Sequence, residues 1–424
     1  MVAVRSAFDG ENWPKYCMHF RVRAAATGDR SRSVPGGRFA ALANRHTTLL
    51  ATCPRQRKAV ILGLVISSNH LLSLLAAMAI ACARPTASAA EHKPSATGNW
   101  YKGIVHAHAN WGVPQLPTTS PDVVVRWYRE HNYNFVSITD LNYYTPAEGL
   151  KALFDAPGRF LVVPGTEASK DPIQPGNKIV DTIGLGVRGA VEPPTGESVS
   201  SVLDSEAKAI RRAGGLPIAA HPNLTYALTA ADLASSDKTS GPRFFEVWNT
   251  EPGMNNLGGG GKPSTEQIWD EVLSGGRVMY GTAVDDCHHF YEFIASRETR
   301  SPLSNPGKAW IMVRAPELSV KAIIDAMNRG DFYATTGVVL AWYEVTSTAI
   351  RIGLDDSSHD LGWSLPGANP QLYRTEFIGK SGEVLKVDES LKPFYQFTGK
   401  ELYVRARITS SDAQMAWTQP IFPR

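Results

Sequence analysis

The sequence predicts an α/β fold, namely a distorted TIM-like barrel of about seven strands followed by a C-terminal antiparallel β-sandwich. From about residue 100, short apolar runs rich in Val, Ile and Phe alternate with helical segments, which is typical of parallel strands joined by helices. After Gly337, the segments alternate apolar and polar residues, which is typical of half-buried antiparallel strands.

Polar residues stand where most of the apolar runs end, and this third observation bears on function. The carboxyl ends of the strands in an α/β barrel converge on one mouth, where such folds carry their chemistry. Imidazoles and carboxylates gathered in one place are first of all metal ligands. The pattern therefore predicts a metallohydrolase. The residues are His106, His108, Asp140, Glu167, His221, Glu246, Asp285, Asp286 and His288.

The strands are expected in the apolar runs that are followed by Gly, Pro or Asn, and we interpret them as buried parallel strands. An open doubly wound sheet is the alternative, but its glycine-rich phosphate loop is missing. The four glycines at 258–261 follow no strand and lack the GK[ST] ending. The expected strands are 104–108, 135–140, 160–167, 178–187, 216–222, 244–249, 277–286 and 309–315.

The helices are expected between the strands, where the sequence carries start and stop signals. Ser120 and Pro121 predict a helix start, since serine caps helices and proline suits the first position. Gly214 predicts the end of an amphipathic helix that begins at Ser198. The expected helices are 121–131, 146–154, 198–213, 265–274 and 319–329.

Charge is distributed unevenly along the 424 residues. Residues 1–58 hold 11 Lys/Arg and three Asp/Glu, whereas residues 91–424 hold 31 Lys/Arg and 37 Asp/Glu. A basic segment followed by an acidic body leaves no basic face on the folded part. No nucleic-acid binding is therefore expected.

Residues 55–90 have the order of a secretory signal peptide. Basic residues at 55–58 precede a long apolar stretch, and the small residues at 87–89 provide a cleavage site. Cleavage would leave a mature chain that starts near residue 91, has no membrane span, and is periplasmic or extracellular. An uncleaved membrane anchor is the alternative, since the stretch is long enough. We expect residues 1–54 to be a disordered or mis-started extension.

The mature chain is expected to divide into a barrel at 91–337 and an accessory β-sandwich at 338–424. Only Cys287 remains in it, so no disulfide can form within one chain. Cys82 ends a short motif that resembles a bacterial lipidation site and is a candidate lipid anchor, although a small apolar residue is the simpler interpretation. His359 lies beside aspartates in a Ser/Gly-rich turn, and we interpret it as part of a solvated loop.

Five ordered motifs at these strand ends resemble the polymerase and histidinol phosphatase (PHP) superfamily of metal-dependent phosphoesterases. The similarity covers roughly residues 100–337 and implies a PHP-type barrel, and the C-terminal β region is similar to an accessory domain of some bacterial members. Each motif alone is weak, but five in the family's order are specific. They are His106-Ala107-His108, Thr139-Asp140-Leu141, Gly165-Thr166-Glu167, His221-Pro222 and Asp286-Cys287-His288.

The chain departs from the family pattern at several ligand positions. Leu141 stands where the second motif has histidine, and Asp181 stands where many members have histidine. The resemblance therefore implies two metal ions and not three, since a third would keep His288 and little else. One ion would be surrounded by His106, His108, Glu167 and Asp286, and the other by Glu167, Asp181 and His221, with Glu167 bridging.

The function that this ligand set implies is hydrolysis of a small phosphorylated substrate. Ligands that mix nitrogen and oxygen without thiolate suit Zn²⁺, Mn²⁺ or Fe²⁺, and two such ions would acidify a water and clamp an in-line displacement. His221 or His288 could protonate the leaving oxygen. Asp140 is a further catalytic candidate, although capping of the following turn is an equal interpretation.

Two other functions stay open. The same ions would serve a non-phosphorus ester, an amide or a glycan, and no cation closer than Lys170 and Lys262 follows a ligand motif as a phosphate clamp. An eroded, non-catalytic binding module would explain the missing ligands and predicts no bound metal. Glu246 either supports a ligand or holds a loop, and the D-x-H spacing favours Asp286 over Asp285 as a ligand.

Overall fold

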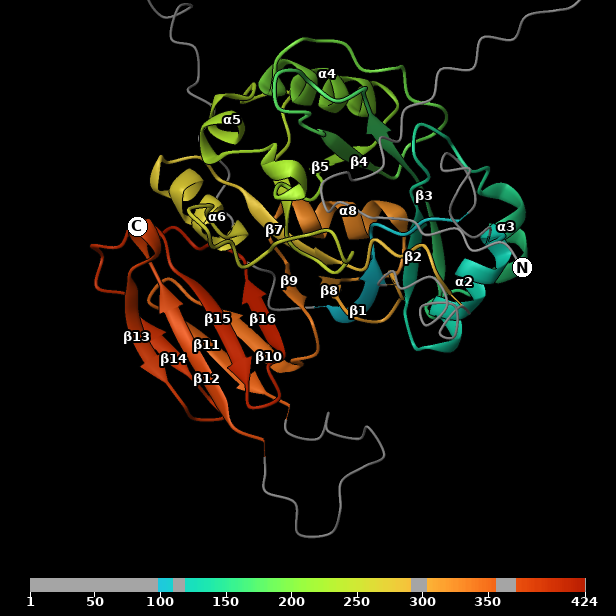
Figure 1. Cartoon of the computed structure of the whole chain (residues 1–424). Helices are drawn as coiled ribbons and strands as arrows, with labels where there is room; N and C mark the ends of the chain where they lie inside the picture. The colour runs from blue at the N-terminus through green and yellow to red at the C-terminus, as the bar shows by residue number, and fades with distance from the viewer. Residues whose placement is uncertain (1–97, 110–118, 291–302, 356–370, 424) are drawn as a thin grey trace, which may run out of the picture. The chain divides into compact units, whose positions relative to one another are not determined.

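The computed structural model describes residues 98–109, 119–290, 303–355 and 371–423, all within one compact unit, Glu91–Arg424 (Figure 1). These residues form a mixed α/β structure built on one large sheet. The predicted signal peptide, the N-terminal extension, Cys82 and His359 lie outside them. No helix within these four ranges is long and apolar enough to cross a membrane.

Seven consecutive strands of the large sheet each lie beside the next one in sequence, and six of them carry predicted apolar runs. They are β1 (Asn99–Ile104), β2 (Phe135–Ile138), β3 (Leu161–Ser169), β4 (Asp181–Leu185), β5 (Leu216–Ala219), β6 (Phe244–Asn249) and β7 (Tyr280–Val284). The predicted strand 104–108 is displaced, because β1 ends at Ile104 and His106 and His108 follow it. Every residue of β2, β4, β5 and β7 is buried, which explains why these runs are apolar instead of alternating.

The direction of β4 differs from the predicted parallel arrangement. Strands β1 to β3 are parallel, and so are β5 to β7, but β4 runs antiparallel to both neighbours. Because β4 is reversed, its first residue lies at the edge where β3 ends. That residue is Asp181, which pairs with Ser169. The reversal therefore brings Asp181 to the same edge as the polar residues that end the other strands.

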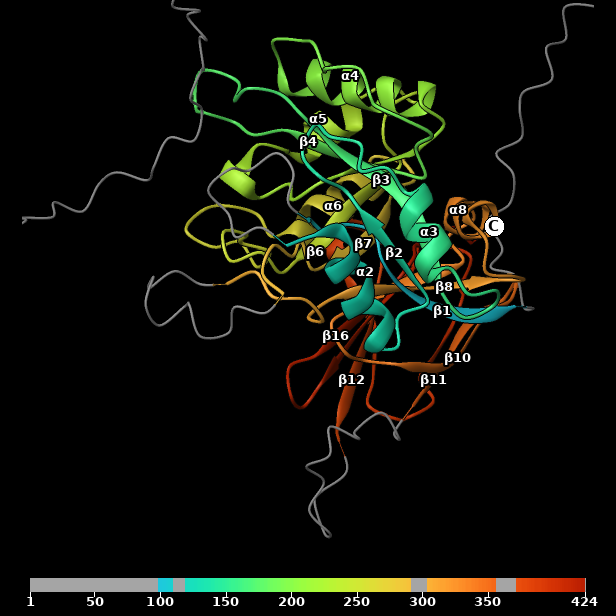
Figure 2. The ribbon, with the colours of Figure 1, turned by 90° about the vertical axis from the view of Figure 1, so that its right-hand side faces the viewer.

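The five predicted helices lie close to their expected places. They are α2 (Pro121–Glu130), α3 (Glu148–Phe154), α4 (Val199–Arg212), α6 (Thr265–Ser274) and α8 (Val320–Asn328), and a further short helix, α5 (Ala230–Ser235), was not predicted. The α4 helix begins after Ser198, whose hydroxyl accepts the Ser201 N–H, and it lies beside β4 and β5 (Figures 1 and 2). Ser120 stands at the start of α2, but its hydroxyl donates to Asp122 and does not cap the helix as predicted.

The sheet does not close into the predicted barrel. On its other side β1 pairs with an antiparallel strand, β8 (Trp310–Ala315), while β7 is the last strand of the sheet. The segments after β1 and β7 meet in an isolated bridge between Ala107 and Cys287. There the His108 N–H donates to the Cys287 carbonyl at 3.0 Å, and the Asp286 N–H donates to the His106 carbonyl at 3.2 Å. This bridge joins the H-x-H and D-x-H motifs without a continuous ladder.

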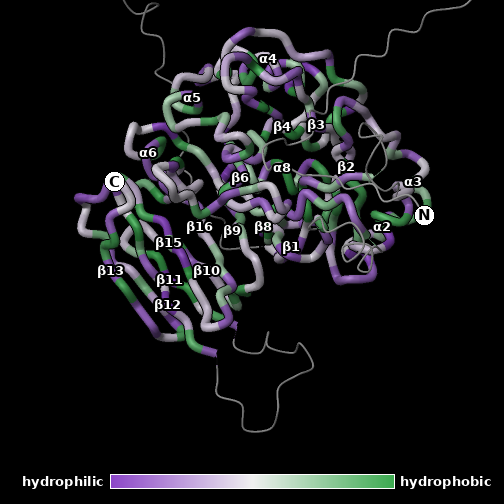
Figure 3. The backbone as a smooth tube through the Cα atoms, in the orientation of Figure 1, coloured by the Kyte–Doolittle hydropathy of each residue, from purple (hydrophilic) through white to green (hydrophobic). Residues whose placement is uncertain are grey.

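The C-terminal strands are antiparallel, as predicted, and hydrophilic and hydrophobic segments alternate along them (Figure 3). One group extends the large sheet beyond β8: β9 (Phe332–Thr335), β16 (Met415–Thr418), β15 (Arg405–Ser410), β12 (Tyr373–Ile378) and β13 (Val384–Asp388). A second sheet holds β10 (Leu340–Val345), β11 (Ala349–Leu354) and β14 (Phe394–Gln396). Because the first group continues the main sheet, the region is not a sandwich with two sheets of its own.

A partly buried group of charged side chains connects α6 to the C-terminal strands. We name it the α6 ionic cluster, and it consists of Glu266, Asp270, Glu376, Arg405 and Arg407. Asp270 accepts two hydrogen bonds from Arg405, from Nε at 2.8 Å and from Nη2 at 2.6 Å. Arg407 Nη1 donates to Glu266 at 3.0 Å. Arg405 is only 1% exposed, so its charge is balanced inside the protein and not by water.

Candidate metal centre

The seven predicted ligand residues lie together at the edge of the sheet where β3 and β5 end and β4 begins. The segments that follow β1 and β7 carry four of them to the same place. Their ligand atoms form three overlapping groups, and within each group the atoms lie within 4.8 Å of one another. The residues come from five separate segments, so it is the fold that unites them. The groups are His106, His108 and Glu167; His108, Asp286 and His288; and Glu167, Asp181 and His221. We name these seven side chains the metal-ligand cluster.

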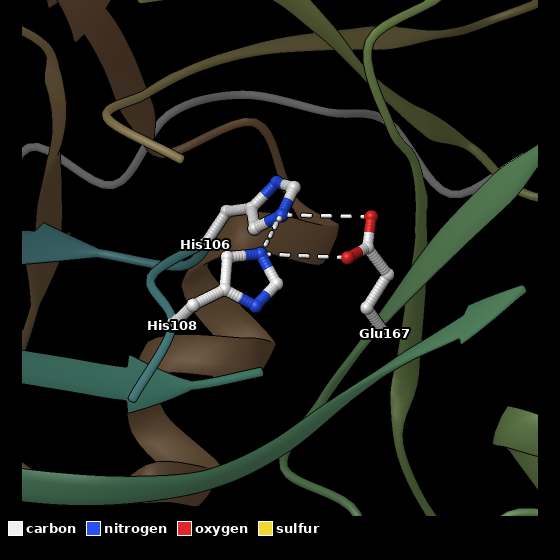
Figure 4. Close-up of side chains that lie close together, drawn as sticks. All are labelled: His106, His108 and Glu167. Atoms are coloured by element: carbon white, nitrogen blue, oxygen red, sulfur yellow. Dashed lines mark hydrogen bonds and ion pairs between the residues drawn. The ribbon is translucent and has the colours of Figure 1, made fainter. Parts of the chain in front are cut away.

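Position 1 is our name for the place between His106, His108 and Asp286. The two histidines are two residues apart, and their Nε2 atoms approach to 3.0 Å (Figure 4). Asp286 Oδ1 lies 3.2 Å from the first Nε2 and 3.1 Å from the second. His288 Nε2 approaches the same oxygen at 3.4 Å, and its ring stacks on His108 with 4.2 Å between centroids. Three imidazole nitrogens thus surround one carboxylate oxygen.

Position 2 is the place between Asp181 and His221, whose Oδ2 and Nε2 atoms are 3.5 Å apart. Glu167 borders both positions. Its Oε1 lies 3.1 Å from His221 Nε2 and 3.6 Å from His106 Nε2, and its Oε2 lies 3.4 Å from His108 Nε2 (Figure 4). This is the arrangement that a bridging carboxylate needs.

The glycine of the G-x-E motif allows β3 to lie close to β2. A Cβ atom on Gly165 would stand 2.2 Å from Ser137 Oγ and 2.8 Å from the Ile138 carbonyl oxygen, far inside contact distance. Any larger residue would push apart the two strands that carry Glu167 and Asp140. In this motif the glycine is therefore needed for packing, and the glutamate is the predicted ligand.

Two ligands have a backbone conformation that L-residues rarely adopt. His221 has φ +23° and Asp286 has φ +48°. Such conformations cost about 1–3 kcal/mol each and persist only where the surroundings hold them. Here the His221 N–H donates to Glu246 Oε2 at 2.8 Å, and the Asp286 N–H donates to the His106 carbonyl. Strain of this kind gathers at functional sites.

Burial and neighbouring charges set the protonation of the cluster. Burial lowers the pKa of His221, but its hydrogen bond to Glu167 and the charge of Asp181 outweigh burial and raise the pKa to about 10. Burial and the charge of His108 lower the pKa of His288 to about 4, so its ring is neutral at neutral pH. Burial and the charge of Glu167 raise the pKa of Asp181 to about 7. Without a metal ion, protons on the cluster offset the negative charge of its carboxylates. A divalent ion that bound there would displace such protons.

The donors fit a divalent transition-metal ion. Metal–nitrogen bonds of 2.0–2.1 Å in tetrahedral geometry place neighbouring ligand atoms about 3.3 Å apart, and the contacts around position 1 are 3.0–3.6 Å. All donors are imidazole nitrogens or carboxylate oxygens, which suits Zn²⁺, Mn²⁺ or Fe²⁺. Asp181 Oδ1 is buried with no hydrogen-bond partner among the described residues, which is unusual for a purely structural carboxylate.

Asp140 is held by the loops around it. Its Oδ1 accepts the Ala109 N–H at 2.8 Å, and its Oδ2 accepts the Thr145 hydroxyl. It belongs to none of the three ligand groups found among the described residues. Its catalytic role therefore stays a prediction, and these contacts are those of a residue that orders the segment after the H-x-H motif.

Asp285, the neighbour of the ligand Asp286, turns away from the cluster. It accepts the backbone N–H groups of residues 307–309 at 2.8–2.9 Å and the Tyr128 hydroxyl at 3.0 Å. Ser304, in the same following segment, donates its hydroxyl to the Asp286 carbonyl. Asp285 thus fixes the backbone that supports Asp286, and the sequence-based preference for Asp286 as the ligand agrees with this geometry.

Glu246 and Asn249 on β6 contact the ligands from behind. Glu246 Oε1 lies 2.6 Å from His106 Nδ1, and Asn249 Nδ2 donates to Glu246 Oε2 at 2.8 Å and to Asp286 Oδ2 at 3.0 Å. Sequence reasoning left the role of Glu246 undecided and did not consider Asn249. Their place in FFEVWN, polar residues in an apolar run next to the predicted mouth, is the signal that could have identified both.

Solved structures provide two similarities. A two-domain protein from Bacteroides vulgatus that contains a predicted PHP-like metal-dependent phosphoesterase is 11% identical, with a TM-score of 0.39, covering 76% of this chain and 95% of that one. A protein from Bifidobacterium adolescentis named as a metal-dependent phosphoesterase is 14% identical, with a TM-score of 0.32, covering 46% and 90%. No family model and no curated protein matches the sequence. At these low values, function has to be inferred from the side chains of the centre.

Proposed function

We propose that this protein is a metal-dependent phosphoesterase. One observation carries the proposal: Glu167 lies between two groups of buried imidazoles and carboxylates, with its oxygens 3.1–3.6 Å from three histidine nitrogens. A bridging carboxylate with nitrogen and oxygen ligands on both sides is the protein part of a two-metal hydrolytic site. Two divalent ions bound there would supply a hydroxide near neutral pH and stabilise an in-line displacement at phosphorus.

The ligands contribute differently to this reaction. Glu167, Asp181 and Asp286 are buried and would provide the negative charge to hold two cations. The side chain of His288 is 16% exposed, whereas those of His106, His108 and His221 are at most 5% exposed. We therefore assign contact with the substrate to His288 in preference to His221, whereas protonation of the leaving oxygen does not fit a His288 ring that is neutral at neutral pH.

A second reaction class uses the same centre on an amide, a glycan or a non-phosphorus ester. One observation favours it: the two lysines nearest to the motifs have other contacts. Lys170 Nζ donates to the Gly196 carbonyl at 2.5 Å, and Lys262 Nζ lies 5.0 Å from the Tyr226 ring centroid. Neither contact is that of a phosphate clamp, so substrate class must be decided by activity.

A non-catalytic module is the weaker alternative. It would retain the fold but would have no reason to keep two strained ligand conformations or a buried carboxylate oxygen without a partner. It predicts only trace metal after purification.

Export is part of the proposal and rests on the order of residues 55–90 alone. A substrate met outside the cytoplasm, such as a nucleotide or a sugar phosphate, follows from that address. N-terminal sequencing of exported protein should find a start near residue 91. Material that retains residues 1–54 would contradict it.

The deciding experiment is an activity screen on metal-free protein reconstituted with Mn²⁺ or Zn²⁺. Phosphate monoesters and diesters are compared with acyl, amide and glycosyl substrates. We expect hydrolysis of phosphate esters that chelation abolishes and added metal restores. Activity that survives chelation, or that appears with non-phosphorus substrates alone, would overturn the phosphoesterase assignment.

A further inference from the structure

The two metal positions differ in how firmly their ligands are held before any ion binds. Metal ligands are usually oriented by hydrogen bonds on the side away from the metal, and losing such a bond typically costs about 10–100-fold in metal affinity. The described residues show two such bonds to the ligands of position 1, but only one, from Ser169 to Asp181, at position 2.

Glu246 orients His106. Its carboxylate is fully buried, and Oε1 lies 2.6 Å from Nδ1 of the imidazole. A carboxylate at this distance holds a proton on Nδ1, so the Nε2 lone pair faces His108 and Asp286. The ring can then neither flip nor change its tautomer without breaking a short, buried hydrogen bond.

Asn249 orients Asp286. Its Nδ2 group donates to Asp286 Oδ2 at 3.0 Å, which leaves Oδ1 to face His106 and His108. Asn249 is itself fixed, because its backbone N–H donates to Asn256 Oδ1 at 3.1 Å and its carbonyl accepts Asn256 Nδ2 at 2.8 Å. Glu246 and Asn249 also bond to each other at 2.8 Å, so one β6 pair fixes two ligands.

Position 2 has weaker support for its side chains, since Asp181 has a bond of this kind from Ser169 and His221 has none among the described residues. Nδ1 of His221 and Oδ1 of Asp181 are buried without a hydrogen-bond partner among the described residues. The bond between Glu246 and His221 is made with the backbone N–H, so it does not orient the imidazole. His108 Nδ1 in position 1 also has no partner, but stacking on His288 at 4.2 Å restrains that ring.

We propose that the two positions fill in order, position 1 first and more tightly, with Glu246 and Asn249 as its positioning residues. An ion at position 1 binds preoriented ligands, whereas an ion at position 2 must order the side chains of Asp181 and His221 as it binds. The second ion also meets the charge of the first across Glu167, which weakens its binding further. Position 2 is therefore the exchangeable position. This inference rests on the metal centre of the proposed function but requires no reaction.

Calorimetric titration of the metal-free full chain with Zn²⁺ tests the order directly. We expect two steps of one ion each, separated by at least about 10-fold in affinity. Glu246→Gln should weaken the first step by about 10–100-fold and change the second little, and Asn249→Ala should do the same to a smaller degree. Asp181→Asn should remove the second step and leave the first. Glu266→Gln, a glutamate of the α6 ionic cluster that accepts from Arg407 Nη1 at 3.0 Å, is the control and should change neither step.

A readout without metal separates positioning from general damage to the fold. In ¹⁵N-histidine NMR of the metal-free protein, His106 should give a strongly deshielded Nδ1 proton that disappears in Glu246→Gln, while circular dichroism stays unchanged. Two equivalent ions that bind in one step, or a Glu246→Gln variant that weakens both steps equally, would overturn the inference but leave a phosphoesterase possible. No metal binding at all would defeat both proposals.

Discussion

Two groups of charged side chains, the metal-ligand cluster and the α6 ionic cluster, differ in how their charges are balanced. In the α6 ionic cluster, carboxylates meet guanidinium groups, as Asp270 meets Arg405 at 2.6–2.8 Å. In the metal-ligand cluster, carboxylates and imidazoles face one another, and no lysine or arginine is found in ion-pair contact with Glu167, Asp181 or Asp286 among the described residues. A cluster that balances its own charge is structural, whereas one that needs an added cation indicates function.

The largest effect should come from removing a ligand of position 1. His106→Ala or Asp286→Ala should lower turnover of a phosphate ester by at least about 10³-fold, or about 4 kcal/mol in the activation barrier, because the nucleophile depends on the metal that they hold. Steady-state kinetics at saturating Mn²⁺ or Zn²⁺ measures this. His131→Ala, an exposed histidine stacked on Trp127, is the matched control and should keep full turnover. Loss of less than 10-fold at both ligands would mean that position 1 is not catalytic.

The metal content of variants should distinguish the role of Glu167, the proposed bridging ligand, from that of His288, which lies at the outside of the cluster. Glu167→Ala should lose both ions, since this carboxylate borders both positions, whereas His288→Ala should lose at most one. Elemental analysis of the purified variants should find about two ions in the wild type, none in the first variant and one or two in the second. A Glu167→Ala protein with full metal content would refute the bridging role.

The α6 ionic cluster should respond in stability and not in metal content. Arg405→Met leaves Asp270 buried and uncompensated, and breaking a buried ion pair in this way costs about 3–5 kcal/mol of unfolding free energy. Denaturant unfolding measures the loss, and elemental analysis should still find two ions. Lys321→Met, which breaks the exposed pair with Asp325, should change stability by less than about 0.5 kcal/mol. If Arg405→Met lost metal while remaining folded, the two clusters would not be independent.

The sequence predicted those features that depend on residues close to one another in the chain. The helix at 265–274 matches α6 in both bounds, because its serine cap and apolar spacing lie within the segment. His106, His108, Glu167 and Asp286 could be predicted as ligands because each follows an apolar run and belongs to a short motif, and the fold brings them together. These features can be recognised in the sequence without knowing which strands lie next to one another.

Long-range pairing could not be predicted in the same way. The contact between Glu246 and His106 spans 140 positions, and no local pattern signals it. The reversal of β4 and the pairing of β1 with β8 instead of β7 depend on which strand edges meet in space. The sequence alone therefore placed Asp181 in a strand without showing that the reversal brings it to the common edge.

Lys102 is a partly buried charge of a third kind, which can be compared with the metal-ligand cluster and the α6 ionic cluster. Its ammonium lies 4.0 Å from the Tyr133 ring centroid and 4.1 Å from that of Trp310, so aromatic faces take the place of a close counter-ion. Burial lowers the pKa of Lys102 to about 8, and the charge of Asp285 opposes this only in part. Folding therefore favours the neutral form of the Lys102 amine.

This charge predicts a pH dependence of stability that should be the smallest of the four effects. The pKa of Lys102 is about 8 in the folded state and 10.5 ordinarily, so between these values the unfolded chain binds more protons and stability rises with pH. The rise should be about 1–3 kcal/mol. Denaturant unfolding of the wild type and of Lys102→Met from pH 7.5 to 10.5 isolates it, because other titrating groups cancel in the difference. The wild type should gain on the variant across this window. A difference that stays constant would mean that the two rings and Asp285 balance this charge as fully as Asp270 balances Arg405.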